Sequence, residues 1–478
     1  MKKNTHFLFV ALLCFSLTLF SQRDAEPVDP LFTSAYTKYE AGDYKGAHED
    51  YTNYLHKKPN DYNALYNRGL CSYSLGDYKD GLRDFSKSIE FGRKKYDGYH
   101  NRGLCSFYLK DYDNALRDFD TVFIYKPEYP KAITYQGACY YFKKKYNDAL
   151  TQLNKAAMLQ SDYEPTYYYR CMTKYYLEDY TGSLADCNTA LSLQKNNDTY
   201  FWRGLNYIEL KRYSEGIVDY DTVIKHDPKY PDAYYNRALA YYELKNYNKA
   251  LEDNNKAIEL DPGFAKAYYN RSLCKFELGN YTAAESDFNS AFSLGIKDDK
   301  LFCWRGANYY EMKKYDMALM DLNKAISMNN TYEIAFYYRA LVKYSLEDDK
   351  GCIEDCNAAL ALKKSYDTYY QRGISKHQLK DYDGAIDDFN QSLALKTDYQ
   401  LAILERGVAY YMKENDDMAI ADLNKAISLD PKSGRAYYYR GKSKKYKNDM
   451  AGSCEDLKKA LSLGYDYASD ELTKNGCK

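Results

Sequence analysis

Residues 436–443 (AYYYRGKS) carry side chains that could bind a phosphate group. Gly441, Lys442 and Ser443 match the end of a phosphate-binding loop, where backbone N–H groups, a lysine and a hydroxyl contact the phosphate oxygens. The first glycine of such a loop is replaced by Ala436. Because alanine lacks the backbone freedom of glycine, we predict that this segment does not bind phosphate.

Cys352 and Cys356 have a spacing that could suit a shared metal ion. Zinc needs three or four protein ligands, however, and no histidine accompanies these two cysteines. The six histidines of the chain are scattered, and none forms a pair on one helix face. We therefore expect no metal, no cofactor and no catalytic residue.

Arginine and aspartate recur sixteen residues apart in eleven places, where they could form ion pairs. Each arginine directly precedes a small residue, usually glycine. The arginines are Arg68, Arg102, Arg170, Arg203, Arg237, Arg271, Arg305, Arg339, Arg372, Arg406 and Arg440. The aspartates are Asp84, Asp118, Asp186, Asp219, Asp253, Asp287, Asp321, Asp355, Asp388, Asp422 and Asp456.

The small residues after these arginines belong to a series of thirteen markers, which defines a repeat from residue 28 to about residue 467. Of the twelve intervals between markers, ten are 34 residues long and two are 33. A period this regular predicts a solenoid, which offers a long surface rather than an enclosed pocket. The markers are Ala35, Gly69, Gly103, Gly137, Cys171, Gly204, Ala238, Ser272, Gly306, Ala340, Gly373, Gly407 and Gly441.

The repeat is best preserved at residues 231–262, where apolar residues recur at helical spacing on either side of a central break. Each unit is therefore predicted to form two short antiparallel helices, the second ended by proline, which lacks the N–H of a continuing helix. This pattern resembles the tetratricopeptide repeat. With Pro231 as position 1, that family's positions 8, 17, 20, 27 and 32 fall on Ala238, Tyr247, Ala250, Ala257 and Pro262.

The resemblance covers residues 28–467 and implies an all-α, right-handed superhelical solenoid of thirteen helix-turn-helix repeats. In this family the first helices form a concave wall, with positions 2, 5, 9, 12 and 13 facing the groove. The family's tyrosine at position 17 is missing from repeats 10, 12 and 13, which leaves the tightness of those hairpins open. The replacing residues are Asp349, Asp416 and Met450.

The arginines and aspartates fall at positions 7 and 23 of the repeat. In the implied hairpin, position 8 of the first helix faces position 23 of the second, so the two charges are neighbours. We predict a ladder of partly buried ion pairs with a structural role, not a catalytic or ligand-binding one. Repeat 4 loses both charges together, to Gln136 and Gln152, and Asp50 of the first repeat has no arginine to match it.

Two aromatic rows are expected in the groove, at positions 5 and 12, which lie two helical turns apart. Rings with an apolar body and a polar tip are frequent anchors of binding surfaces. The alternative is that these rings pack on neighbouring first helices and expose little more than their hydroxyls. The candidate binding residues in the rows are Tyr168, Tyr175, Tyr235, Tyr242, Tyr269, Phe276, Tyr310, Tyr337 and Tyr344.

Position 13 is glutamate in four consecutive repeats, at Glu209, Glu243, Glu277 and Glu311. These residues would form an acidic strip beside the aromatic rows, where a basic partner could dock through ion pairs and cation–π contacts. The alternative is an ordinary solvated face, since glutamate is common at exposed helix ends. We include the four glutamates among the candidate binding residues.

Residues 1–22 have the layout of a secretory signal peptide, with a basic start, an apolar run from Phe7 to Phe20 and a cleavage point near Ser21 or Gln22. This layout predicts export to the periplasm or cell surface of a bacterium, with retention as a membrane anchor as the alternative. No transmembrane span is expected after signal removal. The polar tail at residues 468–478 could form one helical turn over the last repeat.

Twelve cysteines in an exported chain would ordinarily suggest disulfides. Four of them share position 10, a packed site where a thiol behaves as a small hydrophobic group. Removal of Cys14 with the signal peptide leaves eleven, an odd number, so we expect mostly free, buried thiols. The position-10 cysteines are Cys71, Cys105, Cys139 and Cys274.

The net charge of −1, from 67 basic and 68 acidic residues, removes the electrostatic case for a nucleic-acid partner. The sequence favours a non-catalytic scaffold that binds a protein or peptide, with a basic partner suggested by the glutamates. Stacked tyrosines also suit sugar rings, so the alternatives are a carbohydrate or cell-wall glycan binder and an accessory subunit of an envelope complex.

A second period of 169 residues relates residues 163–204 to residues 332–373. The segments share Leu-Glu-Asp and Asp-Cys-Asn motifs beyond what the repeat family requires, and both 33-residue intervals fall at the same place in the longer unit. We infer that a block of five repeats was duplicated. Residues 96–264 are therefore predicted to superpose on residues 265–433 better than on blocks shifted by one repeat.

Overall fold

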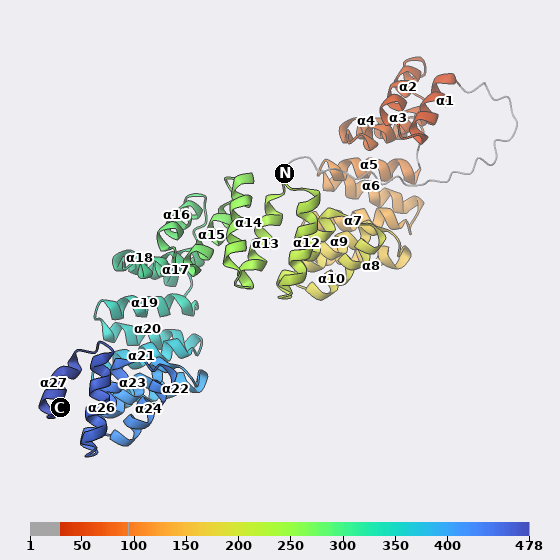
Figure 1. Cartoon of the computed structure of the whole chain (residues 1–478). Helices are drawn as coiled ribbons and strands as arrows, with labels where there is room; N and C mark the ends of the chain where they lie inside the picture. The colour runs from red at the N-terminus through yellow and green to blue at the C-terminus, as the bar shows by residue number, and fades with distance from the viewer. Residues whose placement is uncertain (1–28, 94, 478) are drawn as a thin grey trace. The chain divides into compact units, whose positions relative to one another are not determined.

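The computed structural model describes residues 29–93 and 95–477, which contain twenty-seven α-helices and no strand. The all-α class and the count of about thirteen helix pairs are therefore confirmed. The chain divides into two compact units between Asn236 and Arg237, and α13 (Pro231–Glu243) spans that division. In each unit, antiparallel helix pairs follow one another along the chain (Figure 1).

The first unit contains twelve further helices in six pairs. They are α1 (Pro30–Glu40), α2 (Tyr44–Lys57), α3 (Tyr62–Ser74), α4 (Tyr78–Glu90), α5 (Tyr96–Tyr108), α6 (Tyr112–Tyr125), α7 (Pro130–Phe142), α8 (Tyr146–Leu159), α9 (Glu164–Tyr176), α10 (Tyr180–Leu193), α11 (Asn197–Glu209) and α12 (Tyr213–His226).

The second unit contains α14 and the helices that follow it. They are α14 (Tyr247–Leu260), α15 (Ala265–Glu277), α16 (Tyr281–Ser293), α17 (Asp299–Glu311), α18 (Tyr315–Met328), α19 (Glu333–Ser345), α20 (Asp349–Leu362), α21 (Tyr366–Gln378), α22 (Tyr382–Leu395), α23 (Gln400–Met412), α24 (Asp416–Leu429), α25 (Gly434–Tyr446), α26 (Met450–Ser462) and α27 (Tyr467–Lys474).

A three-residue turn joins the two helices of every repeat. Its middle residue has a positive φ, as at Gly76 (80°) and Lys245 (59°), which reverses the chain within one turn of helix. In seven repeats the third turn residue is an aspartate that caps the second helix by accepting a backbone N–H. The second helix also begins in register at Asp349, Asp416 and Met450, so the missing tyrosines do not move the turn.

The marker residue is small because the second helix packs directly against it. A Cβ added to Gly306 would lie 2.8 Å from Cγ of Leu322, and one added to Gly204 would lie 2.8 Å from the ring of Tyr220. Such distances are shorter than van der Waals contact, so a larger marker would push the helices apart. The marker at position 8 therefore packs against the residue at position 24, sixteen residues later.

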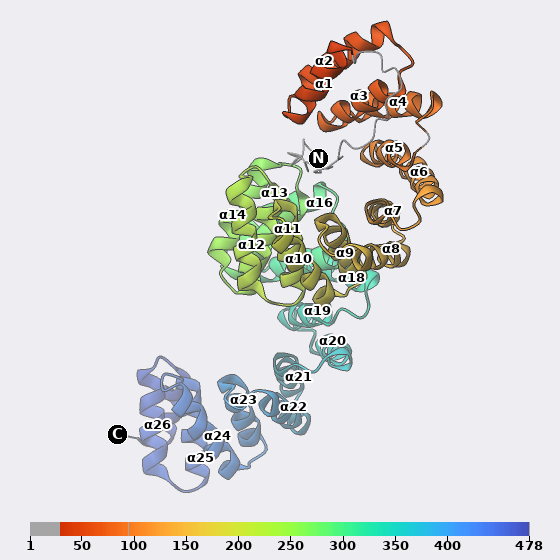
Figure 2. The ribbon, with the colours of Figure 1, turned by 90° about the vertical axis from the view of Figure 1, so that its right-hand side faces the viewer.

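First helices of successive repeats also contact each other within each unit, for example α7 with α9 and α19 with α21. Figure 2 shows the pairing from the side, with α7 next to α8 and α21 next to α22. The first helices therefore form a continuous wall in each unit, as the resemblance implies for the groove.

The two ends of the chain differ in what the structure shows. The predicted signal peptide lies outside the described residues. Across residues 29–93 and 95–477, no helix combines the length and apolar character that a bilayer span requires. At the other end, the polar tail forms helix α27, which packs on the last repeat and buries Ala468 beside Leu457 and Ala460.

Candidate binding surface

The predicted Arg–Asp ladder is confirmed in all eleven repeats. Each guanidinium donates from Nε and Nη2 to the two oxygens of its aspartate, over distances of 2.5 to 3.0 Å. The aspartate side chains are buried, with at most 11% exposure at Asp422. Each arginine and aspartate of the ladder is bonded to its partner within the hairpin, so neither charge is available to bind a ligand.

The ladder also links each repeat to the one before it. In eight repeats Nη1 of the arginine donates to an asparagine at position 25 of the preceding second helix, as Arg271 does to Asn255 at 2.7 Å. Repeat 4, which lacks the ion pair, keeps this link because Gln136 donates to Asp120 at 2.9 Å. The unmatched Asp50 accepts from Ser34 and pairs with Lys38 instead.

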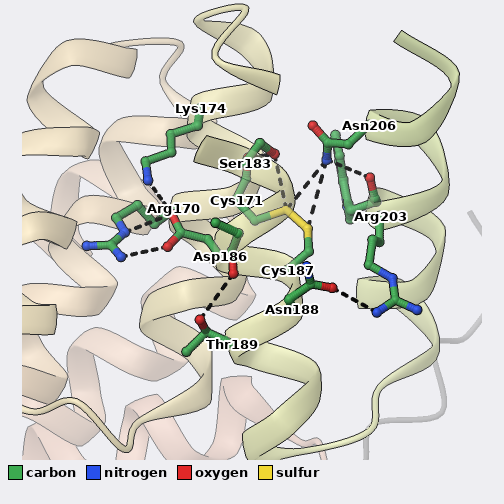
Figure 3. Close-up of a disulfide and its surroundings, with 12 residues drawn as sticks. Arg170, Cys171, Lys174, Ser183, Asp186, Cys187, Asn188, Thr189, Arg203 and Asn206 are labelled. Carbon is green, nitrogen blue, oxygen red and sulfur yellow. Dashed lines mark hydrogen bonds and ion pairs between the residues drawn. A yellow bond between two sulfur atoms is a disulfide. The ribbon is translucent and has the colours of Figure 1, made fainter. Parts of the chain in front are cut away.

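One disulfide lies in the same hairpin contact. Cys171 and Cys187 occupy positions 8 and 24 of repeat 5 and are bonded between α9 and α10 (Figure 3). The Ser183 hydroxyl lies 3.4 Å from the sulfur of Cys171, and the Asn206 amide lies 3.9 Å from each sulfur. Figure 3 also shows Arg170 and Lys174 converging on Asp186 beside the disulfide.

The expectation about the cysteines needs a correction at two pairs. Besides Cys171–Cys187, Cys454 of α26 is bonded to Cys477 beyond α27. The sequence carried a signal for the first bond, because position 8 packs against position 24 in every hairpin. The other cysteines that the structure describes are free and buried, as expected: Cys71, Cys105, Cys139, Cys274, Cys303, Cys352 and Cys356.

The segment that resembles a phosphate loop is helical. Gly441 lies within α25, and the Lys442 ammonium lies over the rings of Tyr411 (5.4 Å) and Tyr438 (5.3 Å). Backbone N–H groups inside a helix are bonded to carbonyls one turn earlier and cannot surround a phosphate. The interpretation that this motif is illusory is therefore confirmed.

The position-12 rings of repeats 5, 8 and 9 each pack between two other rings. Tyr175 contacts Tyr180 of its own repeat (5.4 Å between centroids) and Trp202 of the next (5.5 Å). Phe276 contacts Tyr281 (5.6 Å) and Trp304 (5.6 Å) in the same way. These side chains are therefore partly buried by neighbouring aromatics rather than open on both faces.

Position-5 rings contact either the second helix of their hairpin or the adjacent ring of their own helix. Tyr269 contacts Phe288 of its second helix with centroids 6.1 Å apart, and Tyr337 contacts Tyr338 at 5.6 Å. Burial raises the pKa of Tyr235 to about 12. Part of the surface of each ring is therefore buried by packing on neighbouring side chains, and the rest is exposed to solvent. All nine candidate aromatics are partly buried: Tyr168, Tyr175, Tyr235, Tyr242, Tyr269, Phe276, Tyr310, Tyr337 and Tyr344.

Three rings that contact the position-12 row were not predicted from the sequence. Trp202, Trp304 and Tyr338 occupy position 6, which the resemblance does not assign to the groove. Trp202 contacts Tyr175 and Trp304 contacts Phe276, the position-12 rings of the preceding repeats. Tyr338 contacts both Trp304 and Tyr310. Their recurrence at one position was the available signal.

The four candidate glutamates are exposed at the ends of first helices. The Tyr175 hydroxyl donates to Oε1 of Glu209 at 3.1 Å, from the preceding repeat. Burial and then the Glu277 carboxylate raise the pKa of Tyr247. Burial also raises the pKa of Glu311 above its ordinary range. Each described junction thus places a carboxylate beside tyrosines of the repeat before it.

Comparisons with known proteins match this geometry. Models described as "Tetratricopeptide repeat" match residues 32–93, 231–264, 265–294, 299–332, 366–399 and 402–433, and a model described as "TPR repeat" matches residues 204–245. Together these matches cover more than half of the chain. No curated protein sequence matches it.

Similar solved structures include the APC/C hetero-tetramer Cut9-Hcn1, with 15% identity, coverage of 86% of this chain and 95% of that one, and a TM-score of 0.50. Yeast Tom70 has 16% identity, coverage of 87% and 95%, and a TM-score of 0.37. YrrB, described as a TPR protein with an unusual peptide-binding site, has 20% identity, coverage of 38% and 95%, and a TM-score of 0.32.

The matched residues contain the same helix pairs, three-residue turns and small markers that the structure shows. The likeness to Cut9-Hcn1 extends the solenoid fold over most of the chain. Apart from repeat 4, the hairpins outside the matched ranges repeat the same Arg–Asp pair, as at Arg170 and Asp186. This chain belongs to the tetratricopeptide repeat family.

Proposed function

We propose that this protein is an exported, non-catalytic scaffold whose first-helix wall binds a protein or peptide partner. The observation that carries the proposal is the combination, on one set of helices, of partly exposed aromatic rings with exposed carboxylates. Phe276 and Tyr310 supply rings at position 12, and Glu277 and Glu311 follow them at position 13. Such a surface offers apolar anchors beside groups that can bind positive charge.

Two disulfides support export. Disulfides persist in oxidising compartments and are rare in the reducing cytosol. Cys171–Cys187 joins the two helices of repeat 5, and Cys454–Cys477 joins α26 to the segment beyond α27. With the predicted signal peptide, they favour the periplasm or the cell surface of a bacterium as the site of action.

The charge distribution favours a partner segment with basic residues. Glu277 and Glu311 are both exposed, one repeat apart. A peptide that presents lysine or arginine to them would gain ion pairs and cation–π contacts with the adjacent rings. The near-neutral whole chain gives no such attraction to nucleic acid.

Site-specific photo-crosslinking tests the proposal. Tyr344 of α19 is replaced by a photoreactive phenylalanine derivative, and Met320 of α18, which is 63% exposed on a second helix, serves as the matched control. We expect a protein adduct from position 344 after irradiation in cells and none from position 320. Adducts with cell-wall glycan would favour the alternative function, and adducts of equal yield at both positions would contradict a specific surface.

A further inference from the structure

The junction between successive repeats is filled differently in different parts of the array. At three junctions of the first unit, the position-17 tyrosine stacks face to face on a ring at position 13 of the next repeat. Tyr112 and Phe142 are 5.3 Å apart with planes inclined by 2°, and Tyr146 and Tyr176 are 5.1 Å apart with planes inclined by 2°. A flat group therefore fits against this tyrosine face.

Two junctions of the second unit contain a carboxylate in place of that second ring. Tyr247 is followed by Glu277, and Tyr281 is followed by Glu311. Both glutamates are exposed. Burial, and after it the charge of the glutamate in the next repeat, raise the pKa of Tyr247 and of Tyr281. Each junction thus has an aromatic face and a negative charge at its edge.

Glu311 is the less engaged of the two carboxylates. At the equivalent junction in the first unit, the position-12 residue Tyr175 donates its hydroxyl to Glu209. The position-12 residue before Glu311 is Phe276, which has no hydroxyl to donate. The oxygens of Glu311 are therefore available to a donor supplied by a ligand.

Contacts elsewhere in the chain show that a guanidinium can lie against an aromatic ring while it bonds to a carboxylate. In the ladder, the Arg271 guanidinium lies 5.2 Å from the centroid of Tyr268 and forms a two-point bond with Asp287 at 2.7 Å for each contact. The same combination recurs at Phe336, Arg339 and Asp355. A planar cation satisfies both elements at once.

We propose that Tyr247 with Glu277, and Tyr281 with Glu311, form two adjacent sites that each bind an arginine side chain of a partner protein. The guanidinium would stack on the tyrosine face, where Phe142 and Tyr176 stack in the first unit, and donate to the glutamate. This proposal rests on the proposed scaffold function and assigns its partner class. Lysine would fit less well, because an ammonium group can neither stack nor form the two-point bond.

The test uses the full chain with Trp202→Phe, which leaves Trp304, 5.6 Å from Phe276, as the single tryptophan reporter. The probes are three blocked twelve-residue peptides in which glycine alternates with arginine, lysine or citrulline. Citrulline keeps the planar shape of arginine without its charge. Binding is measured by fluorescence titration at low salt and repeated with added salt, which weakens exposed ion pairs.

Two double variants separate charge from shape. Glu277→Gln with Glu311→Gln removes the charge and keeps the size. Glu277→Tyr with Glu311→Tyr installs the ring that position 13 carries naturally at Tyr108 and Tyr176, and should block the tyrosine faces without unfolding the hairpins. Circular dichroism and thermal unfolding of each variant check the fold.

We expect the arginine peptide to bind at least about tenfold more tightly than the citrulline peptide and about threefold more tightly than the lysine peptide. Both double variants should lose at least about tenfold in affinity for the arginine peptide. Equal binding of the three peptides, or unchanged binding by the glutamine variant, would overturn the arginine sites. The crosslinking experiment at Tyr344 is independent, so its failure would overturn the scaffold function even if the peptide bound.

Discussion

Arg305 and Asp321 form a two-point ion pair that connects the helices of repeat 9. Nε lies 2.6 Å from Oδ2 and Nη2 lies 3.0 Å from Oδ1, with the side chains 11% and 2% exposed. The third guanidinium nitrogen, Nη1, donates to Asn289 of α16 at 3.1 Å. One arginine therefore holds α17 to α18 and to the preceding repeat.

Removal of the carboxylate should weaken this part of the array. Asp321→Ala leaves a buried guanidinium without its counter-charge, so we expect a loss of about 3 kcal/mol in local unfolding free energy. Hydrogen exchange of α17 and α18 measures it, with Lys324→Ala, an exposed charge on α18, as the control. Equal protection in the two variants would show that the pair contributes no more than a surface charge.

The Cys171–Cys187 bond should contribute to stability through the unfolded chain. It closes a loop of sixteen residues, and its removal by Cys171→Ala with Cys187→Ala should cost about 3 kcal/mol. Thermal unfolding with and without reductant measures the loss. Cys454→Ala with Cys477→Ala should instead raise hydrogen exchange mainly in α27. If reductant lowered the melting temperature of the Cys171→Ala, Cys187→Ala variant as much as that of the parent, the Cys171–Cys187 bond would not be the source of this stability.

Repeat 10 offers a direct test of the contact between positions 8 and 24. It has Ala340 and Cys356 where repeat 5 has its two cysteines, and both residues are buried. Ala340→Cys should therefore form a new disulfide with Cys356. Thiol titration after denaturation should find one thiol fewer than in the parent. With Cys356→Ser added, the count should return to that of the parent; a count one above the parent in the single variant would rule out the bond.

Glu164 predicts a pH dependence of stability in the first unit. The side chain is 5% exposed, and burial raises its pKa to about 7. Because the folded state holds this proton more tightly than the unfolded state, its contribution is full below the unfolded pKa of about 4.3. It declines as pH rises to about 7, by roughly 4 kcal/mol in total.

Glu164→Gln keeps the shape of the side chain and removes its titration. We expect this variant to lose the decline in melting temperature between pH 5 and pH 8 that the parent shows, and to be the more stable of the two at pH 8. A parallel pH profile in the variant and the parent would assign the decline to other groups.

The 169-residue duplication stays a prediction, because the first of the two blocks, residues 96–264, crosses the division between the two units. Individual contacts are copied at this spacing. Lys174 reaches Asp186 at 2.8 Å, and Lys343 reaches Asp355 at 2.9 Å. The ladder aspartate thus has a lysine as its second cation in both repeats, as it also does at Asp287, Asp388 and Asp456.

The sequence by itself determined the repeat, the helix pairs and the ion-pair ladder. These features depend on contacts within one hairpin, where position 7 and position 23 are always neighbours, so a residue pattern suffices to predict them. Arg305 and Asp321 could be paired for this reason without coordinates. The exposed glutamates and partly buried rings at positions 5 and 12 were also assigned to the right helices.

Only the tertiary structure decided what fills the space between repeats. Whether Tyr112 meets a ring and Tyr281 a carboxylate depends on how one hairpin stacks on the next, which no single repeat encodes. The contact of Trp304 with Phe276 of the preceding repeat also depends on this stacking. The sulfur of Cys187 bonds to that of Cys171 because two helices approach closely. Short-range periodicity fixes the hairpin, whereas side-chain volume and packing across helices fix the surface.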